Sequence, residues 1–472
     1  MTDPLIGFED DKKKKIELVK EVILTKASHS DVEILQRIDR VCGEGAQLHI
    51  ITLSGGYTNY SYKISVLGHS DLVVFAKLSF EYALWNPDKK AYYDLKRTVC
   101  EYEIMDKMAK NTPGCVVSPL ACVDVEDEGQ RMKLLLTEWS KADEQLCNQF
   151  IDGAVDPRIA PQLARVFKTL HTIEFDPNFN EQVKPCMLSL FDQVIEYAKK
   201  TCEQMTPKDR TEKYMVVLGS DLMQKILQSN LSDYNTRDCL IHSDSHVFNI
   251  IVEAKPSVEE LQSFGPNGNL VLVDWEMCMA GPVGRDLGLA LSFPIGCRVA
   301  HALRGHSDAD KSINAFIISL IDNYAKCMSN TGKSDEVSSI LRNAAGWAGW
   351  FMLFAFYFLD AQMVAFPCAT EHDRKYVRDS MGVLGLKLLR LSYDTDYFPS
   401  DATTTQVKKM FQMLVEEQVT ETALERAMHK RRMQPRKSSM LRAANRRVSD
   451  TLLNFGAVND EKCYNENSVT EQ

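Results

Sequence analysis

A stretch in the middle of the chain contains the residue types and the spacing that phosphoryl transfer requires. An apolar run leads into His242 and Asp244, and Asn249 follows five residues after Asp244. A second apolar run ends in Asp274, with Glu276 two positions further on. One carboxylate can orient an attacking hydroxyl, while an amide and a second carboxylate can hold magnesium on the phosphates. We therefore predict Asp244 as the catalytic residue and Asn249 and Asp274 as metal ligands. Glu276 is a further candidate ligand, because it points the same way as Asp274 if the backbone stays extended.

The residues around Asp244 are expected to support it or to meet the substrate. His242 is predicted to be structural, with its ring bonded to loop backbone so that Asp244 is held still. Ser245 and His246 are candidates for lining the acceptor pocket, and a surface position is the alternative for both. Asp286 follows a tight turn and is expected to anchor the loop by accepting backbone hydrogen bonds, an act close to that of a helix N-cap.

Earlier in the chain, Gly55 and Gly56 lie between two runs that alternate like the strands of a hairpin, and Asn59 follows them; all three are candidates for binding the nucleotide. Backbone without side chains can approach a phosphate closely. Gly-Gly is also common at hairpin turns for reasons of geometry alone. Lys77 closes a later apolar strand and could reach the nucleotide phosphates; the alternative is an ordinary lysine at a strand edge.

An amphipathic helix is predicted over 92–110, and it carries Glu101 and Glu103. One of them could pair with Lys77, as a helix glutamate pairs with a strand lysine in kinases, and we favour Glu101. A buried strand that ends at Glu138 marks the hinge if the molecule has two lobes. Backbone groups around Glu138 would then bind the adenine edge.

Composition narrows the class of protein. At 472 residues the chain is long for one core, so two lobes with tails are expected. Its net charge of -10 argues against extensive nucleic-acid binding. The thirteen cysteines form no metal-ligand pattern, and no signal peptide follows Met1, so we expect reduced thiols in a cytoplasmic protein. The apolar run 344–359 is too short to span a bilayer and is expected to form a core helix.

The order of these motifs resembles that of the aminoglycoside phosphotransferase and choline kinase superfamily, the small-molecule branch of the protein-kinase-like fold. The resemblance covers roughly residues 54–288 and implies dependence on ATP and Mg²⁺ and transfer to an alcohol group of a small molecule. It also implies a two-lobed α+β fold, with a small N-terminal antiparallel sheet lobe and a large, mainly α-helical C-terminal lobe. The expected divisions are a helical extension, the N-lobe, the C-lobe, and a C-terminal helix with a basic tail, at 1–45, 46–141, 142–400 and 401–472.

Within that superfamily the chain is most similar to methylthioribose kinase, through Asp274-x-Glu276 and the turn segment 281–288. The paired arginines that this family uses for the sugar are missing, because no arginine occurs between Arg342 and Arg374. The acceptor could therefore be a methylthioribose-like sugar or an amino alcohol.

Aromatic residues replace those arginines: Trp347, Trp350 and Phe354. They could form a cation-π site for an amine, as a choline or ethanolamine kinase would need, or they could simply pack the helix. A non-catalytic, kinase-like scaffold is the alternative of another class. The presence of Lys77 and Asp244 with the predicted metal ligands argues against it, since a scaffold needs none of them.

Both ends of the chain carry basic runs. Residues 12–15 are four lysines, which we expect to form a solvated helix face. Residues 426–447 contain basic residues and no acidic ones. Ser438 and Ser449 each follow basic residues and are candidate phosphorylation sites, although basic tails are also commonly just solvated.

Overall fold

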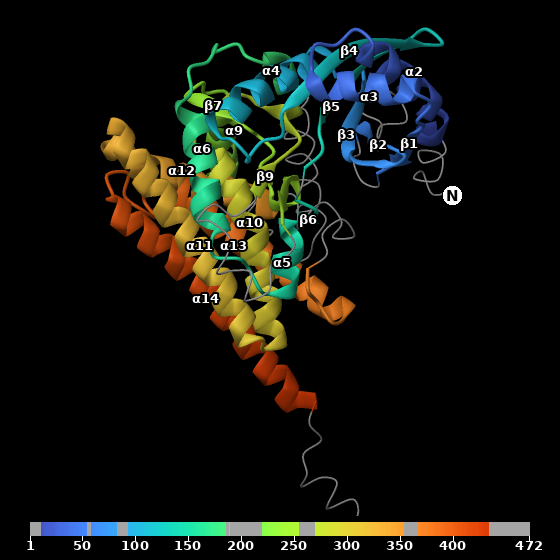
Figure 1. The fold of residues 1–472 in the computed structure, drawn as a ribbon. Coiled ribbons are helices and arrows are strands. Elements are labelled where there is room, and N and C mark those ends of the chain that lie inside the picture. Colours follow the sequence, from blue (N-terminus) through green and yellow to red (C-terminus); the bar gives the residue numbers. More distant parts are fainter. Residues whose placement is uncertain are drawn as a thin grey trace, which may run out of the picture. The chain divides into compact units, whose positions relative to one another are not determined.

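The computed structural model describes residues 11–53, 58–82, 93–140, 142–185, 188, 220–253, 270–353 and 366–433. The chain divides into two compact units, residues 1–420 and 421–472. The larger unit begins with a sheet-based part and continues as a mainly helical one (Figure 1). This confirms the predicted two-lobed α+β architecture. Within the described ranges, no helix has the length and apolar character needed to cross a membrane.

The N-terminal lobe is built on one antiparallel sheet with the strand order β1-β2-β3-β5-β4. Alternation sets its buried face: Tyr60, Tyr62, Ile64 and Val66 of β2 point into the core. Helix α4 (Lys96–Asn111) lies in the chain between β3 and β4. The strands are β1 (Leu48–Thr52), β2 (Asn59–Val66), β3 (His69–Phe80), β4 (Pro119–Asp127) and β5 (Gln130–Glu138).

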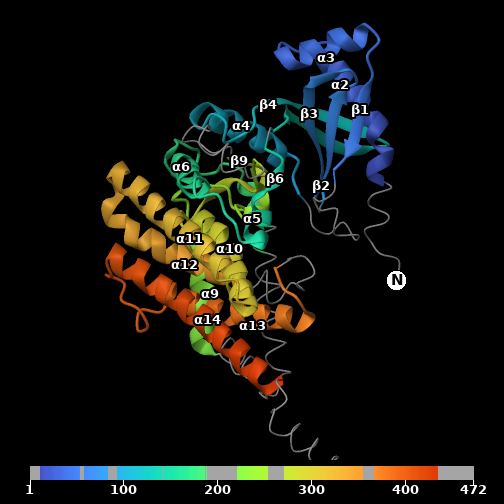
Figure 2. The ribbon, with the colours of Figure 1, turned by 60° about the horizontal axis from the view of Figure 1, so that its bottom comes forward.

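Two helices precede the sheet, α2 (Ile16–Ala27) and α3 (Glu33–Gly43), and lie beside it in Figure 2. Their apolar side chains share a core with the sheet. The lysine run just before α2 differs from the expected solvated face. Lys12 is fully buried, and its ammonium donates to the carbonyl of Leu53. Lys15 forms an ion pair with Asp127 at 2.6 Å. The prediction is therefore wrong for these two lysines, which attach the N-terminal segment to the sheet.

Short strands and single helical turns place the residues predicted to act on phosphate. Strand β7 ends at Ile241, directly before His242, and β9 ends at Leu272, two residues before Asp274. The turns η2 (Val247–Asn249) and η4 (Trp275–Met277) follow. The strands form two small antiparallel sheets, β7 (Cys239–Ile241) with β10 (Met279–Gly281), and β8 (Ile250–Val252) between β6 (Glu144–Gln145) and β9 (Leu270–Leu272).

Helices form the rest of the larger unit, and α10 is their centre: every residue from Arg285 to His301 is buried. Helices α12 and α13 cross at Gly349 and Gly385, where a Cβ on Gly349 would lie 2.5 Å from the Gly385 carbonyl oxygen. The apolar run 344–359 begins inside α12 as a core helix, and Phe354 lies outside the described residues. The helices are α5 (Leu146–Asp152), α6 (Ile159–Thr172), α9 (Asp221–Tyr234), α10 (Arg285–Arg304), α11 (Ser307–Met328), α12 (Val337–Phe351), α13 (Glu371–Tyr393) and α14 (Thr404–Met433), with short turns η1 (Glu181–Val183), η5 (Ser329–Lys333) and η6 (Ser334–Glu336).

Candidate active site

Asp286 holds the loop that carries Asp244. Its fully buried carboxylate accepts from the backbone N–H groups of His242 at 2.7 Å and Ser243 at 2.9 Å. It also accepts from the Ser245 hydroxyl at 3.0 Å and lies 3.1 Å from His171 Nε2. Burial acts to raise the pKa of Asp286, but His171 and the loop donors bring it below the ordinary value. These contacts are those of an anchoring residue, and His171 is a partner that the sequence did not reveal.

Ser245 is placed differently from the expectation that it lines an acceptor pocket. Its side chain is fully buried, and its hydroxyl donates to the carboxylate and the carbonyl of Asp286. The Ser245 hydroxyl therefore helps to hold the loop and does not line a pocket for the acceptor substrate.

The loop is also held from its carbonyl side, by Arg285. Ser243 has a left-handed backbone with φ of 68°, and its carbonyl accepts from Arg285 Nε at 3.0 Å. The buried guanidinium lies over three aromatic rings, 4.6 Å from Trp347, 5.0 Å from Tyr234 and 5.7 Å from Trp350. The aromatic cluster thus already contains a cation from the protein. This corrects the prediction that Trp350 contributes to a cation-π site for a substrate amine.

Asp244 lies at the end of this loop with its side chain one-third exposed, at 34%. Asn249 Nδ2 donates to the Asp244 carbonyl at 2.9 Å and to its carboxylate at 3.1 Å. His246 Nε2 is 3.3 Å from the other carboxylate oxygen. The buried ring of His242 contacts the Val273 carbonyl at 3.0 Å, and burial lowers the pKa of this histidine. Neutral His242 therefore connects the Asp244 loop to the strand that leads to Asp274.

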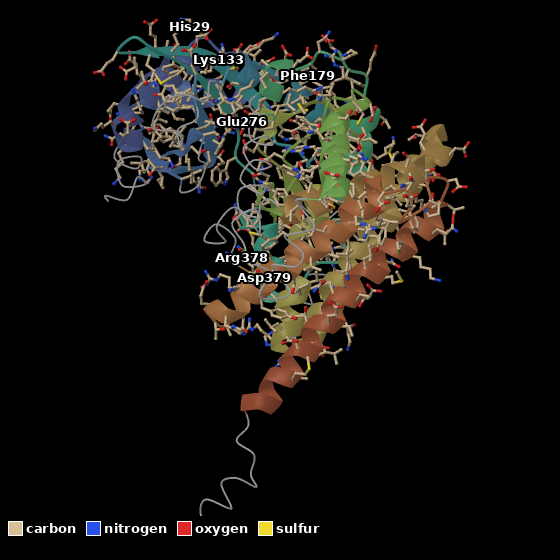
Figure 3. All side chains as sticks on the ribbon, turned by 180° about the vertical axis from the view of Figure 1, so that it is seen from behind. His29, Lys133, Phe179, Glu276, Arg378 and Asp379 are labelled. Carbon is tan, nitrogen blue, oxygen red and sulfur yellow. The ribbon has the colours of Figure 1, made fainter. Side chains whose placement is uncertain are left out.

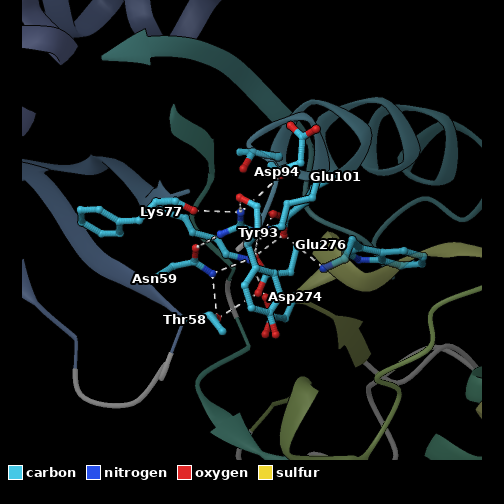
Figure 4. Close-up of polar contacts among 12 residues, drawn as sticks. Thr58, Asn59, Lys77, Tyr93, Asp94, Glu101, Asp274 and Glu276 are labelled. Carbon is cyan, nitrogen blue, oxygen red and sulfur yellow. Dashed lines mark hydrogen bonds and ion pairs between the residues drawn. The ribbon is translucent and has the colours of Figure 1, made fainter. Parts of the chain in front are cut away.

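Lys77 of β3 meets two carboxylates (Figure 4). Its ammonium lies 3.0 and 3.1 Å from the oxygens of Glu101 and 2.5 Å from Asp274 Oδ1. Burial alone would lower the pKa of Lys77, but the surrounding carboxylates raise it above its usual value, so the ammonium stays charged. Glu101 also accepts from the backbone N–H of Trp275 at 3.1 Å, whereas Glu103 is exposed. Helix α4 thus contacts both the strand lysine and the turn after β9.

Glu276 does not point the same way as Asp274, contrary to the metal-ligand prediction. Its buried carboxylate accepts from Thr58 Oγ1 at 2.9 Å, Asn59 Nδ2 at 2.8 Å and Arg97 Nε at 3.2 Å. Glu276, labelled in Figure 3, is only 3% exposed and so lies in the interior of the larger unit. The prediction assumed extended backbone, but Asp274 has φ of 65° and residues 275–277 form a helical turn. The alternation of a strand therefore does not apply, and Glu276 points toward the N-terminal lobe.

Asn59, expected to bind the nucleotide, belongs to the same network and also lines the cavity described below. Both ends of its amide are used inside the network, since Nδ2 donates to Glu276 and Oδ1 accepts from Arg97 at 3.1 Å. Arg97 itself was missed by the sequence reading. Its position four residues before Glu101, on the same helix face, is the one signal that could have identified it.

A cavity of about 300 Å³ lies between the sheet and the small strands of the second lobe. Lys77, Glu138, Asn249 and Asp274 line it together. Its volume is at the lower end of the range for small-molecule sites. Gly55 and Gly56, predicted to contact phosphate, lie outside the described residues.

The residues of this cavity fit a magnesium ion that is held together with phosphates. Asn249 and Asp274 supply an amide oxygen and a carboxylate, which are hard donors. Within the described ranges, no group of three or more His, Cys, Asp or Glu side chains could hold a metal by itself. Magnesium in phosphotransferases is commonly bound by one or two protein groups, with water and phosphate oxygens completing its shell.

Comparison with known proteins gives a family match. The model of the phosphotransferase enzyme family matches residues 49–311, more than half of the 472-residue chain. No curated protein matches the chain significantly in sequence.

Solved structures show distant similarity. An ethanolamine kinase from Plasmodium vivax is 11% identical, with 79% of this chain and 82% of that chain covered and a TM-score of 0.37. An aminoglycoside phosphotransferase from Alicyclobacillus acidocaldarius is 10% identical, with 77% and 92% covered and a TM-score of 0.40. A glucosamine kinase is 12% identical, with 71% and 80% covered and a TM-score of 0.39.

Proposed function

Because the chain belongs to the phosphotransferase enzyme family, we propose that it transfers the γ-phosphate of ATP to a hydroxyl group of a small molecule, with Mg²⁺ as cofactor. One observation carries the proposal: Lys77, Asn249 and Asp274 line a single cavity, although Lys77 and Asp274 are 197 positions apart in the chain. A nucleotide triphosphate with magnesium needs this combination of a cation and hard oxygen donors.

Each residue then has one task. Lys77 binds phosphate oxygens, held in place by Glu101, and backbone near Glu138 binds the adenine edge. Asn249 and Asp274 hold Mg²⁺, which when bound offsets the negative charge on the phosphates. Asp244 orients the acceptor hydroxyl in line with the γ-phosphate and takes its proton late in the reaction.

The side chains in and around α12 bear on the class of acceptor substrate. Arg285 fills the aromatic cluster, so that cluster is closed to a quaternary ammonium group. Arg342 donates to the carbonyls of Pro399 and Ser392 and is therefore committed to the fold. We favour a sugar-like polyhydroxyl acceptor over choline or ethanolamine, and this acceptor would be bound without the paired arginines of methylthioribose kinase.

Thermal shift with ATP, with and without Mg²⁺, followed by a transfer assay over sugars, amino alcohols and aminoglycosides, tests the proposal. We expect Asp244→Ala to abolish transfer while ATP binding remains, and Asp274→Ala to lose the magnesium-dependent part of ATP affinity. A fully active Asp244→Ala protein would refute the assignment. Nucleotide binding without transfer to any acceptor would instead favour the non-catalytic scaffold.

A further inference from the structure

Arg97 is a fully buried arginine that joins several elements of the N-terminal lobe. Its Nη1 donates to the carbonyls of Phe80, at the end of β3, and Tyr93, before α4, both at 3.0 Å. Its Nη2 donates to Asn59 at 3.1 Å. Its Nε is the group that reaches Glu276 in the second lobe, at 3.2 Å. Contacts within the N-terminal lobe therefore hold the guanidinium in place, in addition to its contact with Glu276.

Glu276 is held from both lobes. Its side chain is bonded to Thr58, Asn59 and Arg97, all from the N-terminal lobe. Its backbone carbonyl accepts from Asn180 Nδ2 at 2.9 Å, within the helical lobe. Because Asp274 and Glu276 belong to one turn, whatever fixes Glu276 also fixes the residue that faces the cavity.

Helix α4 contacts the segment 274–277 through two residues that are four positions apart in the helix. Glu101 accepts the backbone N–H of Trp275, and Arg97 donates to the side chain of Glu276. Lys77 Nζ lies 3.5 Å from Glu276, farther than from Glu101 or Asp274. Arg97 is thus the nearer counter-ion of Glu276, while Lys77, which also pairs with Glu276, lies closer to the two carboxylates that face the cavity.

We propose that Glu276 is a positioning residue, which Arg97 and Asn59 lock to the N-terminal lobe so that Lys77 and Asp274 keep the spacing needed for a magnesium nucleotide. The role depends on the proposed function, but the Arg97–Glu276 coupling can be measured without it. A metal ligand at Glu276 would have to give up several buried donors, which is costly for each group left unpaired.

A double-mutant cycle with Arg97→Gln, Glu276→Gln and the combined variant tests the proposal. The readout is the affinity for a non-hydrolysable ATP analogue with Mg²⁺, measured by calorimetry well below the melting temperature. Each single variant should bind about tenfold more weakly, and the double variant should be no weaker than the worse single one. The Mg²⁺ concentration for half-maximal binding should stay within about twofold of the wild type in Glu276→Gln, and should rise in Asp274→Asn.

Two further variants complete the test, one as a control and one as an alternative to Arg97→Gln. Lys96→Gln removes an exposed positive charge beside Arg97 and should leave nucleotide affinity unchanged. Thr58→Val removes the hydroxyl that donates to Glu276 and accepts from Asn59 Nδ2, and should weaken binding by about threefold, which serves if Arg97→Gln does not fold.

Three outcomes would refute the proposal that Arg97 and Asn59 lock Glu276 to the N-terminal lobe. One is a magnesium requirement that rises in Glu276→Gln as much as in Asp274→Asn. The second is a lowered melting temperature with unchanged nucleotide affinity. The third is independent, additive effects of the two substitutions. If wild-type protein binds no magnesium nucleotide, the proposed function fails by itself. The coupling of Arg97 to Glu276 in thermal unfolding without nucleotide would then still decide whether the lock exists.

Discussion

Replacing Asp286 with asparagine should destabilise the protein in a pH-dependent way. Each carboxylate oxygen of Asp286 has two hydrogen-bond partners. Oδ2 accepts from the backbone N–H of His242 and contacts the ring of His171. Oδ1 accepts from the backbone N–H of Ser243 and from the hydroxyl of Ser245. Asparagine keeps one oxygen and turns an NH₂ group toward the other two donors. Breaking such a buried charged cluster costs about 3 to 4 kcal/mol.

The loss can be converted to a melting temperature. With unfolding entropy of about 2.1 cal/mol/K per residue, a unit of this size has an unfolding entropy of roughly 0.9 kcal/mol/K. The expected decrease is therefore about 4 °C at pH 7. Differential scanning fluorimetry measures it, and Asp308→Asn, which alters an almost fully exposed carboxylate, is the matched control with no appreciable change.

The sign of the pH dependence follows from the lowered pKa of Asp286. A carboxylate whose pKa is lower in the folded state stabilises the protein above its unfolded pKa of about 4, and that contribution disappears as the pH falls toward the folded value. The gap in unfolding free energy between wild type and Asp286→Asn should be full at pH 7 and should narrow below about pH 4. Urea unfolding at several pH values measures it. A gap that stays constant with pH, or a decrease below about 1 °C at pH 7, would refute the reasoning.

Three other substitutions test separate parts of the structure. Gly349→Val would force a side chain onto the Gly385 carbonyl and should lower the free energy of unfolding by about 2 kcal/mol or more, measured by urea unfolding. Arg285→Met should lower the rate of transfer by about tenfold while nucleotide affinity stays the same, because the loop before Asp244, the proposed catalytic residue, loses its carbonyl-side bond; an unchanged rate would contradict this. Lys12→Met should lower the free energy of unfolding by about 1 kcal/mol, whereas Lys13→Met, at an exposed position, should change it little.

Local patterns predicted the strands and helices, and the resemblance of their order to a known superfamily implied the architecture. Alternating apolar residues indicated the strands, and the order of motifs indicated two lobes. Spacing also pointed to Lys77, Glu101 and Asp286, whose contacts in the structure are of the expected kind. In each case, a regular strand or helix carries the side chain, so periodicity along the chain holds the necessary information.

Contacts between distant residues could not be predicted in this way. Arg97 and Glu276 are 179 positions apart, and nothing in the sequence indicates that their side chains meet. Arg285 was overlooked because a fully buried arginine over aromatic rings is unusual, and composition favours arginine at the surface. The orientation of Glu276 was predicted from strand alternation, which the left-handed backbone of Asp274 interrupts.

The left-handed backbone at Ser243 also bears on how the protein can evolve. A non-glycine residue in this conformation costs roughly 1 to 3 kcal/mol, so glycine at position 243 would relieve strain. It would also free the chain directly before Asp244 and remove the hydroxyl that lies 3.3 Å from Arg285. Selection for heat resistance alone should favour glycine here, whereas selection for turnover should retain serine. Laboratory evolution under each pressure would therefore drive this single position in opposite directions.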